Sequence, residues 1–414
     1  MIASGDSDTL GCMPLLTGLR IIELGEEVTT PFAGKLLADL GADVLKVEPL
    51  PFGDRGREAP PFAGERPGPG NSLLFAHLNA AKRSIALRLS TPTGRALFKS
   101  LLREADALLC GYTPAVLASF GLSLENLQRD LPRLVIASVT PFGLTGPDRD
   151  APGSPFVSYQ ASGAGHTSPF YVPGPESPPL VLPGRPAAVT GGLMGAAACL
   201  LALMARRHNG GGTLVDVSEV ETLFPVVADQ TNNYNFSGVV ERRNKRVKGM
   251  APFGFFPVKD GYASLFIIQE AQWQRFVRMM GDPEWTKAEM FQVRRTRAQY
   301  KEDLEALMAP WLDEQEAEDL YVRSQAADVP IGPARTMDNV MKDEQLIARR
   351  AFAPGKRADG GPFIGLRAPY RVDGEMTPDG RRAPALGEHT RDLLMAWLGL
   401  SAADVDALSA AGVV

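Results

Sequence analysis

Histidine and cysteine side chains, the usual metal ligands and frequent nucleophiles, are few and scattered in this sequence. They are His77, His166, His208, His389, Cys12, Cys110 and Cys199. No histidine has a ligand partner at metal-binding spacing, and neither a Gly-x-Ser-x-Gly motif nor a Cys/His arrangement occurs. We therefore predict no metal site and no serine or cysteine nucleophile, and we expect His389 to lie at a helix start.

The sequence also lacks the glycine-rich loops that bind nucleotide phosphates. The first strand-like run is followed by GEEVTTP (25–31), which is not a Gly-x-Gly-x-x-Gly loop. The NGGGT stretch (209–213) has no Gly-Lys-Ser/Thr ending and predicts a turn. The basic run at 242–248 could meet phosphates, but its composition is more typical of a solvated linker. Neither a dinucleotide site nor a P-loop is indicated.

The overall composition is that of an ordinary globular protein with more than one domain. The 414 residues are many for one compact domain, and 44% of them are hydrophobic. A net charge of −5 gives no electrostatic case for binding nucleic acid. Three cysteines are too few for a disulfide framework, and no basic region followed by an apolar run opens the sequence. We therefore expect a cytoplasmic protein that binds no nucleic acid.

One segment is long and apolar enough to be considered as a membrane span. Residues 187–205 carry no charge and include the Gly191-x-x-x-Gly195 spacing that packs transmembrane helices. The run is rich in alanine and glycine rather than leucine, however, and it leads directly into a turn and a strand. We therefore predict a buried helix of an α/β protein and no membrane association.

Strand-like and helix-like segments alternate over the first 140 residues. Thr30-Pro31 is typical of an N-cap followed by proline at the first helical position, and Thr91-Pro92 repeats this pattern. The predicted strands are 20–24, 42–48, 84–89, 107–112 and 134–139. Strands separated by helices predict a parallel sheet that is covered on both faces.

The remainder of the chain changes in character. Residues 145–185, rich in Gly, Pro and Ser, predict a long irregular passage over the surface. The run at 255–267 predicts a strand pair, followed by helices that together form a smaller domain. The C-terminal residues 383–414 predict two amphipathic helices, with Ser401 and Asp404 capping the second.

Nine short motifs follow one another along nearly the whole chain. They are GLRIIEL (18–24), TPFAGKLLADLGADVLKVE (30–48), HLNAAKRSIALRLSTPTGRALF (77–98), LASFGL (117–122), VIASVTPFGLTGP (135–147), GTLVDVSEVET (212–222), FGFFPVKDGYASL (253–265), ADVPIGPARTMDNVMKDEQLIARRAF (327–352) and APALGEHT…GVV (383–414). In this order and spacing the sequence resembles the class III CoA-transferases, the group that contains formyl-CoA transferase, carnitine CoA-transferase and the methylacyl-CoA racemases.

The resemblance implies a fold and an assembly. The expected fold class is α/β, with a large parallel-sheet domain formed by the N- and C-terminal parts, residues 1–225 and 332–414. A linker at 226–249 and a smaller α+β domain at 250–331 complete the chain. Two subunits threaded through each other would form an interlocked-ring dimer.

The resemblance also implies covalent catalysis by an aspartate, which attacks the thioester of an acyl-CoA before CoA passes to a carboxylic acid. It places this aspartate shortly after the TGP motif (145–147). Counting from the flanking Pro-Gly (152–153) and Ser-Gly (162–163) pairs puts the position at Pro155, within GSPFVSYQASG. Because proline carries no nucleophile, we predict that this chain has no catalytic residue of its own.

The residues that would bind CoA are only partly present. The phosphates of CoA need cations or helix N-termini, yet Pro49 and Ser119 stand at two positions that are often basic in the family. The Asn79-x-x-Lys82-Arg83 element remains, so the resemblance predicts Asn79, Lys82 and Arg83 as CoA-binding residues. Alternatively, this element only joins a turn to a strand. No tightly bound cofactor is implied, and a CoA thioester is the expected substrate.

Three functions are compatible with this sequence. In the first, the chain is the non-catalytic subunit of a heterodimeric or heterotetrameric CoA-transferase, such as succinyl-CoA:benzylsuccinate CoA-transferase, whose homologous partner carries the aspartate. In the second, it is a stand-alone acyl-CoA enzyme (a transferase, racemase or lyase) that uses another residue. In the third, it is a binding or regulatory protein that keeps only the fold. We rank them in this order.

Overall fold

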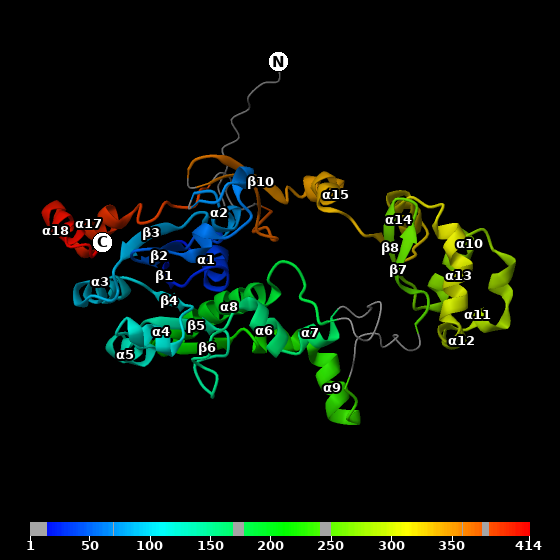
Figure 1. The fold of residues 1–414 in the computed structure, drawn as a ribbon, viewed down its shortest axis with the longest axis horizontal. Helices are drawn as coiled ribbons and strands as arrows, with labels where there is room; N and C mark the ends of the chain where they lie inside the picture. Colours follow the sequence, from blue (N-terminus) through cyan, green and yellow to red (C-terminus); the bar gives the residue numbers. More distant parts are fainter. Residues whose placement is uncertain (1–14, 69, 169–177, 241–249, 358, 375–380) are drawn as a thin grey trace, which may run out of the picture. The chain divides into compact units, whose positions relative to one another are not determined.

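The computed structural model describes residues 15–68, 70–168, 178–240, 250–357, 359–374 and 381–414 (Figure 1). These residues form two compact units. The larger unit combines the N-terminal part, through residue 240, with Ala348–Val414, and the smaller unit is made of residues 250–347. This division differs from the predicted boundary at 331, since residues 332–347 lie with the smaller unit.

A six-stranded parallel sheet with the order β3-β2-β1-β4-β5-β6 forms the centre of the larger unit. Its strands are β1 (Arg20–Leu24), β2 (Asp43–Pro49), β3 (Arg83–Leu87), β4 (Ala107–Cys110), β5 (Val135–Thr140) and β6 (Leu214–Ser218). Every residue of β4 and β5 is buried, as expected for strands with both faces covered. The predicted α/β class with a large parallel sheet is confirmed.

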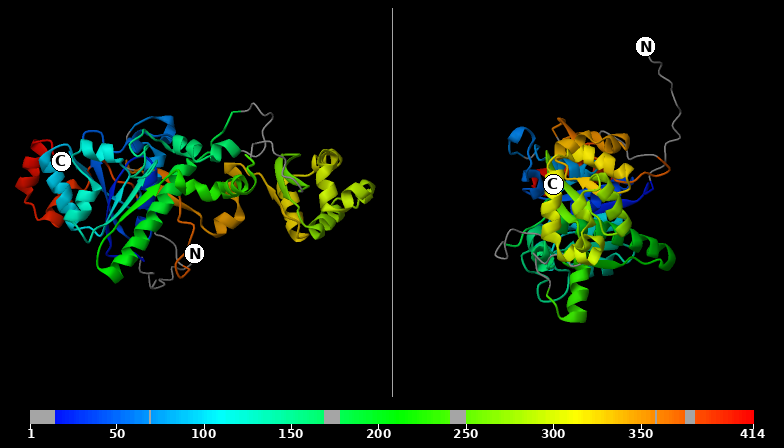
Figure 2. Two further views of the ribbon diagram at one scale, coloured as in Figure 1. Left: turned by 90° about the horizontal axis from the view of Figure 1, so that it is seen from below. Right: turned by 90° about the vertical axis from the view of Figure 1, so that its right-hand side faces the viewer.

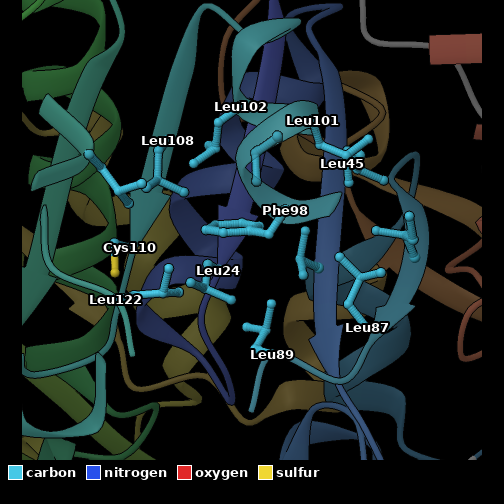
Figure 3. Packing of buried hydrophobic residues seen from close by; sticks show 14 of the residues in the cluster. Leu24, Leu45, Leu87, Leu89, Phe98, Leu101, Leu102, Leu108, Cys110 and Leu122 are labelled. Atoms are coloured by element: carbon cyan, nitrogen blue, oxygen red, sulfur yellow. The ribbon is translucent and has the colours of Figure 1, made fainter. Parts of the chain in front are cut away.

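Helices cover both faces of this sheet (Figures 1 and 2). They include α1 (Thr29–Asp39), α2 (Leu73–Asn79), α3 (Pro92–Arg103), α4 (Pro114–Ser119), α5 (Leu124–Asp130), α8 (Pro186–Asn209), α17 (Thr390–Leu398) and α18 (Ala402–Ala410). Because side chains alternate along a strand, Ile21 packs with α1 and α8 while Ile22 packs with α3 and α17. Figure 3 shows this second layer, in which Phe98 of α3 lies among Leu24 and Leu108.

The helix α8 is long and apolar enough to cross a bilayer by length and composition, but one of its faces packs along α1 and β5. A Cβ at Gly195 would lie 2.5 Å from Val139 Cγ2, and one at Gly192 would lie 2.5 Å from the Thr29 carbonyl oxygen. A Cβ at Gly191 would lie 3.2 Å from Thr29 Cγ2. The glycines therefore let α8 approach both the sheet and α1, so the Gly191-x-x-x-Gly195 spacing serves packing within this unit.

The smaller unit is a three-stranded antiparallel sheet packed with helices. The strands, in the order β7-β8-β9, are β7 (Phe253–Val258), β8 (Gly261–Phe266) and β9 (Ile331–Pro333). The helices are α10 (Glu270–Met279), η4 (Glu284–Lys287), α11 (Glu289–Gln292), α12 (Arg294–Gln299), α13 (Lys301–Leu312), α14 (Ala317–Ala326), α15 (Met337–Lys342) and α16 (Glu344–Ala348). The predicted strand pair is present as β7 and β8, and Trp273, Phe276 and Met308 lie at the centre of the core.

Helices occur both in the passage predicted to be irregular and in the predicted linker. The passage 145–185 includes α6 (Pro155–Ala161) and α7 (Ala164–Thr167), because Ser154 caps the first of these and Pro155 fits its first position. The predicted linker includes α9 (Ala228–Ser237), which follows η3 (Glu221–Val227) and ends at Gly238 with φ of 66°. The rest of that linker, from residue 241, lies outside the described residues.

The C-terminal residues cover the outer edge of the sheet at β3. The backbone N–H of Gly387 donates to Ser84 Oγ at 2.9 Å, and the Ser84 N–H donates to His389 Nδ1 at 3.2 Å. His389 is the N-cap of α17, as predicted, and Ser401 with Asp404 forms the predicted capping box of α18. Shorter elements complete the unit: η1 (Arg55–Glu58), η2 (Ala63–Glu65), β10 (Phe352–Lys356) and β11 (Pro362–Leu366).

The close approach of α8 to β5 makes a stability prediction. We expect Gly195→Val to lower the free energy of unfolding by about 1–3 kcal/mol, because the added side chain overlaps Val139. Urea denaturation followed by circular dichroism measures this. Arg207→Gln at an exposed position of α8 is the control and should change stability by no more than about 0.5 kcal/mol. Equal effects of the two substitutions would contradict the packing argument.

Candidate functional site

The strand order changes direction between β1 and β4, and this point marks the candidate site. In doubly wound sheets, ligands bind in the crevice outside the carboxyl ends of the strands at such a point. Here β1 ends at Leu24 and β4 ends at Cys110, and each strand is followed by a glycine, Gly25 and Gly111. The loops after these strands therefore define the mouth of the site.

The side chain of Thr30 fills the space between these two glycines. A Cβ at Gly25 would lie 2.6 Å from Thr30 Cβ, and one at Gly111 would lie 2.2 Å from Thr30 Oγ1. Thr30 is therefore not the N-cap that the sequence predicted. The helix α1 begins at Thr29 after Val28, without a side-chain cap, because the Thr29 hydroxyl donates to Glu219 and the Thr30 side chain packs between the two glycines.

Beyond the ends of β1 and β2, one arginine faces two glutamates. The Tyr112 hydroxyl donates to Glu26, and Arg55 Nε donates to the other oxygen of Glu26 at 2.6 Å. Arg55 also lies 3.5 Å from Glu27. Burial, together with Glu26, raises the pKa of Tyr112, so its phenol stays protonated. Two glutamates thus share one arginine at this end of the sheet, so Arg55 is already paired within the chain.

Deeper at the same end of the sheet, Glu23 is buried between two lysines. Lys46 Nζ lies 2.8 Å from Glu23 Oε1, and Lys82 Nζ lies 2.7 Å from Glu23 Oε2. Asp54 pairs with Lys46 at 2.7 Å, so two cations face two anions. Although burial opposes it, Asp54 and Glu23 raise the pKa of Lys46, while Lys46 holds the pKa of Asp54 low. Burial lowers the pKa of Lys82 to about 8.

The predicted CoA-binding residues Asn79 and Lys82 belong to this buried cluster. Besides Glu23, Lys82 donates to the Pro31 carbonyl oxygen at 2.7 Å and to Asn79 Oδ1 at 3.0 Å. An ammonium group has three N–H donors, so none is left for a phosphate. Arg83 is partly exposed, but it pairs with Asp43 and stacks on the Trp397 ring at 5.2 Å. CoA binding by these three residues stays a prediction, and this geometry favours the structural alternative.

Pro155, the position that the resemblance assigns to the nucleophile, is the first residue of α6. Ser154 Oγ accepts a hydrogen bond from the Val157 N–H at 3.3 Å, which caps the helix. Proline suits this position because its missing N–H would have no helical partner. The assignment stays a prediction. The residue at this place offers no carboxylate, hydroxyl or thiol.

A carboxylate that the sequence did not predict lies beside Ser158, one helical turn after Pro155. Glu219, directly after β6, is 4% exposed. Its Oε2 accepts from Ser158 Oγ at 2.7 Å and its Oε1 accepts from the Thr29 hydroxyl. Hydrogen bonds to a charged group contribute about 1.5–3 kcal/mol each. The available sequence signal was an acidic residue placed immediately behind a half-buried strand.

The other carboxylates at the strand ends are likewise held by internal partners. Asp216 accepts a hydrogen bond from the Leu144 N–H at 3.0 Å, and Glu48 receives two bonds from Arg57, at 2.6 and 2.8 Å. Over the described part of the chain, no group of three or more His, Cys, Asp or Glu residues is placed to hold a metal ion. The strand ends therefore carry several acids, each fixed by hydrogen bonds or ion pairs.

Comparisons with known proteins place this architecture in one family. The model of CoA-transferase family III matches residues 16–390. Succinyl-CoA–D-citramalate CoA-transferase of Chloroflexus aurantiacus is 32% identical over 96% of this chain and 98% of its own length. The BbsE subunit of succinyl-CoA:(R)-benzylsuccinate CoA-transferase of Thauera aromatica is 31% identical over 95% and 97%.

A solved structure agrees with this placement. The crystal structure of a CAIB/BAIF family protein from Brucella suis is 30% identical, covers 93% of this chain and 99% of its own, and superposes with a TM-score of 0.81. The two-domain plan, the strand order and the nine motifs thus have one common explanation. The chain belongs to CoA-transferase family III.

Proposed function

We propose that this chain is the non-catalytic subunit of a heteromeric CoA-transferase, which moves CoA from an acyl-CoA such as succinyl-CoA to a carboxylic acid. The exchange takes place at an aspartate of a homologous partner chain. The observation that carries this proposal is that the described residues of the candidate site offer no accessible carboxylate at the expected position. Pro155 offers none, and Glu23, Glu48 and Glu219 are buried and held by internal partners.

The names of the relatives support both the reaction class and the partner. The two relatives described above are named as enzymes or subunits that use succinyl-CoA, and one of them is a subunit of a larger enzyme. The surface of α8 also supports a partner, because Leu193, Leu201 and Met204 are more than half exposed on its outer face. Apolar side chains gathered on one helix face are typical of an interface. An interlocked heterodimer or heterotetramer would cover them.

A second candidate is a stand-alone acyl-CoA enzyme that uses a carboxylate other than the family aspartate. Glu219 is the observation that favours it, because this glutamate is buried beside α6 with only neutral hydroxyls as partners. A desolvated carboxylate without a cation is a strong nucleophile once it is exposed to a thioester. No specific observation favours the third candidate, a protein that keeps only the fold.

Co-expression separates the two candidates. We expect the chain alone to transfer no CoA from succinyl-CoA to carboxylic acids, and we expect it to co-elute with an aspartate-bearing homologue from the same organism as an active complex. Size-exclusion chromatography and thioester exchange followed by mass spectrometry measure both. The control is the same complex with that aspartate changed to alanine. A homodimer of this chain that transfers CoA at the rate of the complex would refute the non-catalytic role.

Restoring a carboxylate at the predicted position makes a second test. We expect Pro155→Asp to fold, since aspartate is favourable in the first turn of a helix, but not to raise the transfer rate of the isolated chain. The reason is that Arg55 is paired with Glu26 and Glu27, and that Lys82 has no free donor for a phosphate. Pro155→Ala controls for the loss of the ring. A rise of more than about tenfold over this control would show that the site needs only the carboxylate.

A further inference from the structure

The point where α1, α6 and α8 meet contains a buried carboxylate held in an unusual way. We propose that the hydroxyls of Thr29 and Ser158 form a binding cradle for a carboxylate, and that Glu219 occupies it as an internal ligand. Glu219 thereby excludes a substrate acid from this chain's own site. The inference rests on the proposed function for the class of ligand, a short carboxylic acid or the carboxylate end of an acyl group.

The absence of a cation distinguishes Glu219 from the other acids of the interior. Four carboxylates of the described residues are buried: Glu23, Glu48, Asp54 and Glu219. The first three pair with Lys46, Lys82 or Arg57. Glu219 has no such ion pair in the described part of the chain. Buried charges are normally paired, because desolvation of an isolated ion is costly. Glu219, which is held only by neutral donors, therefore differs from the other buried carboxylates, whose charges are balanced by lysine or arginine.

The cradle is bidentate and comes from separate elements. Ser158 Oγ of α6 donates to Oε2 at 2.7 Å, and the Thr29 hydroxyl at the start of α1 donates to Oε1. Each oxygen thus receives one donor, which matches the two-oxygen shape of a carboxylate. Hydroxyl donors carry no charge, so the same pair can hold an acid that enters from solution as well as the glutamate.

Gly191 of α8 leaves the space for this carboxylate. A Cβ at Gly191 would lie 3.0 Å from Glu219 Cγ and 3.2 Å from Thr29 Cγ2. A larger residue at 191 would therefore press on both the stem of the glutamate and one of its donors. Removal of the Glu219 side chain beyond Cβ leaves the volume of a CH₂–COO⁻ group, and acetate has that size and charge.

The test is to remove the Glu219 side chain from the full-length protein and to measure whether the protein then binds acetate. We expect Glu219→Ala to bind acetate saturably, seen by calorimetry and by a rise in melting temperature, whereas the unchanged chain should show no such binding. Acetamide, which has the shape but not the charge, should bind about tenfold more weakly or worse. Glu221→Ala, which removes an exposed acid two residues away, is the matched control and should gain nothing.

The inference also requires that acetate binding by Glu219→Ala depends on the hydroxyls of Thr29 and Ser158. Adding Ser158→Ala or Thr29→Val to Glu219→Ala should weaken acetate binding about tenfold or more, the loss of one hydrogen bond to a charged group. If Glu219→Ala does not fold on its own, its refolded yield in acetate compared with acetamide gives the same readout, and we expect rescue by acetate alone.

Three results would overturn the inference. One is a folded Glu219→Ala that binds no acetate. Another is binding that persists when both hydroxyls are removed. The last is a CoA or acyl adduct on Glu219 when the unchanged chain meets succinyl-CoA, since this would make the glutamate a nucleophile instead of an internal ligand. Failure of co-elution with a homologue would refute the proposed function and leave the acetate result untouched, so the two failures are distinguishable.

Discussion

Glu23, buried between Lys46 and Lys82, fixes the geometry of the sheet end on which the rest of the site is built. Its two oxygens bind one lysine from β2 and one from the turn before β3, so three neighbouring segments are held in a single register. Removing one partner of such a buried pair typically costs about 3–5 kcal/mol, because an uncompensated charge remains inside. The cluster also requires Gly34 of α1, where a Cβ would lie 1.9 Å from Glu23 Oε2.

This cluster limits what the site can bind. A phosphate needs cations with free donors, and Lys82 directs all three N–H groups to internal acceptors. Beyond the ends of β1 and β2, Arg55 is paired with Glu26. Both the stability of the sheet and the binding of CoA phosphates require lysine or arginine side chains. In this chain Lys82 and Arg55 are bound to internal acceptors and so serve the fold. A partner that keeps its own phosphate contacts would complement this arrangement.

Local sequence signals predicted the strands well and the tertiary contacts poorly. The predicted strand 20–24 has the bounds of β1, because a short apolar segment between polar neighbours is a local feature. Thr91-Pro92 is an N-cap with proline, as predicted. Thr30-Pro31 has the same pattern but a different outcome, since Gly25 and Gly111 leave space that Thr30 fills. Glu219 could not be connected to its partners by any local rule, because Thr29 and Ser158 lie 190 and 61 residues away.

The interior holds carboxylates in two ways, and the contrast bears on how this chain differs from a catalytic one. Glu23 and Glu48 are neutralised by cations and serve the fold. A residue in the place of Glu219 that served only packing would be expected to be apolar, since replacing buried ionic groups by apolar ones is often neutral or stabilising. A glutamate there, with hydroxyls on both oxygens and Gly191 beside it, indicates a region shaped around a carboxylate. Recognition of a carboxylate and attack on a thioester are separable properties. We propose that the first is present at this junction, whereas Pro155, where the resemblance expects the nucleophile, provides no group for the second.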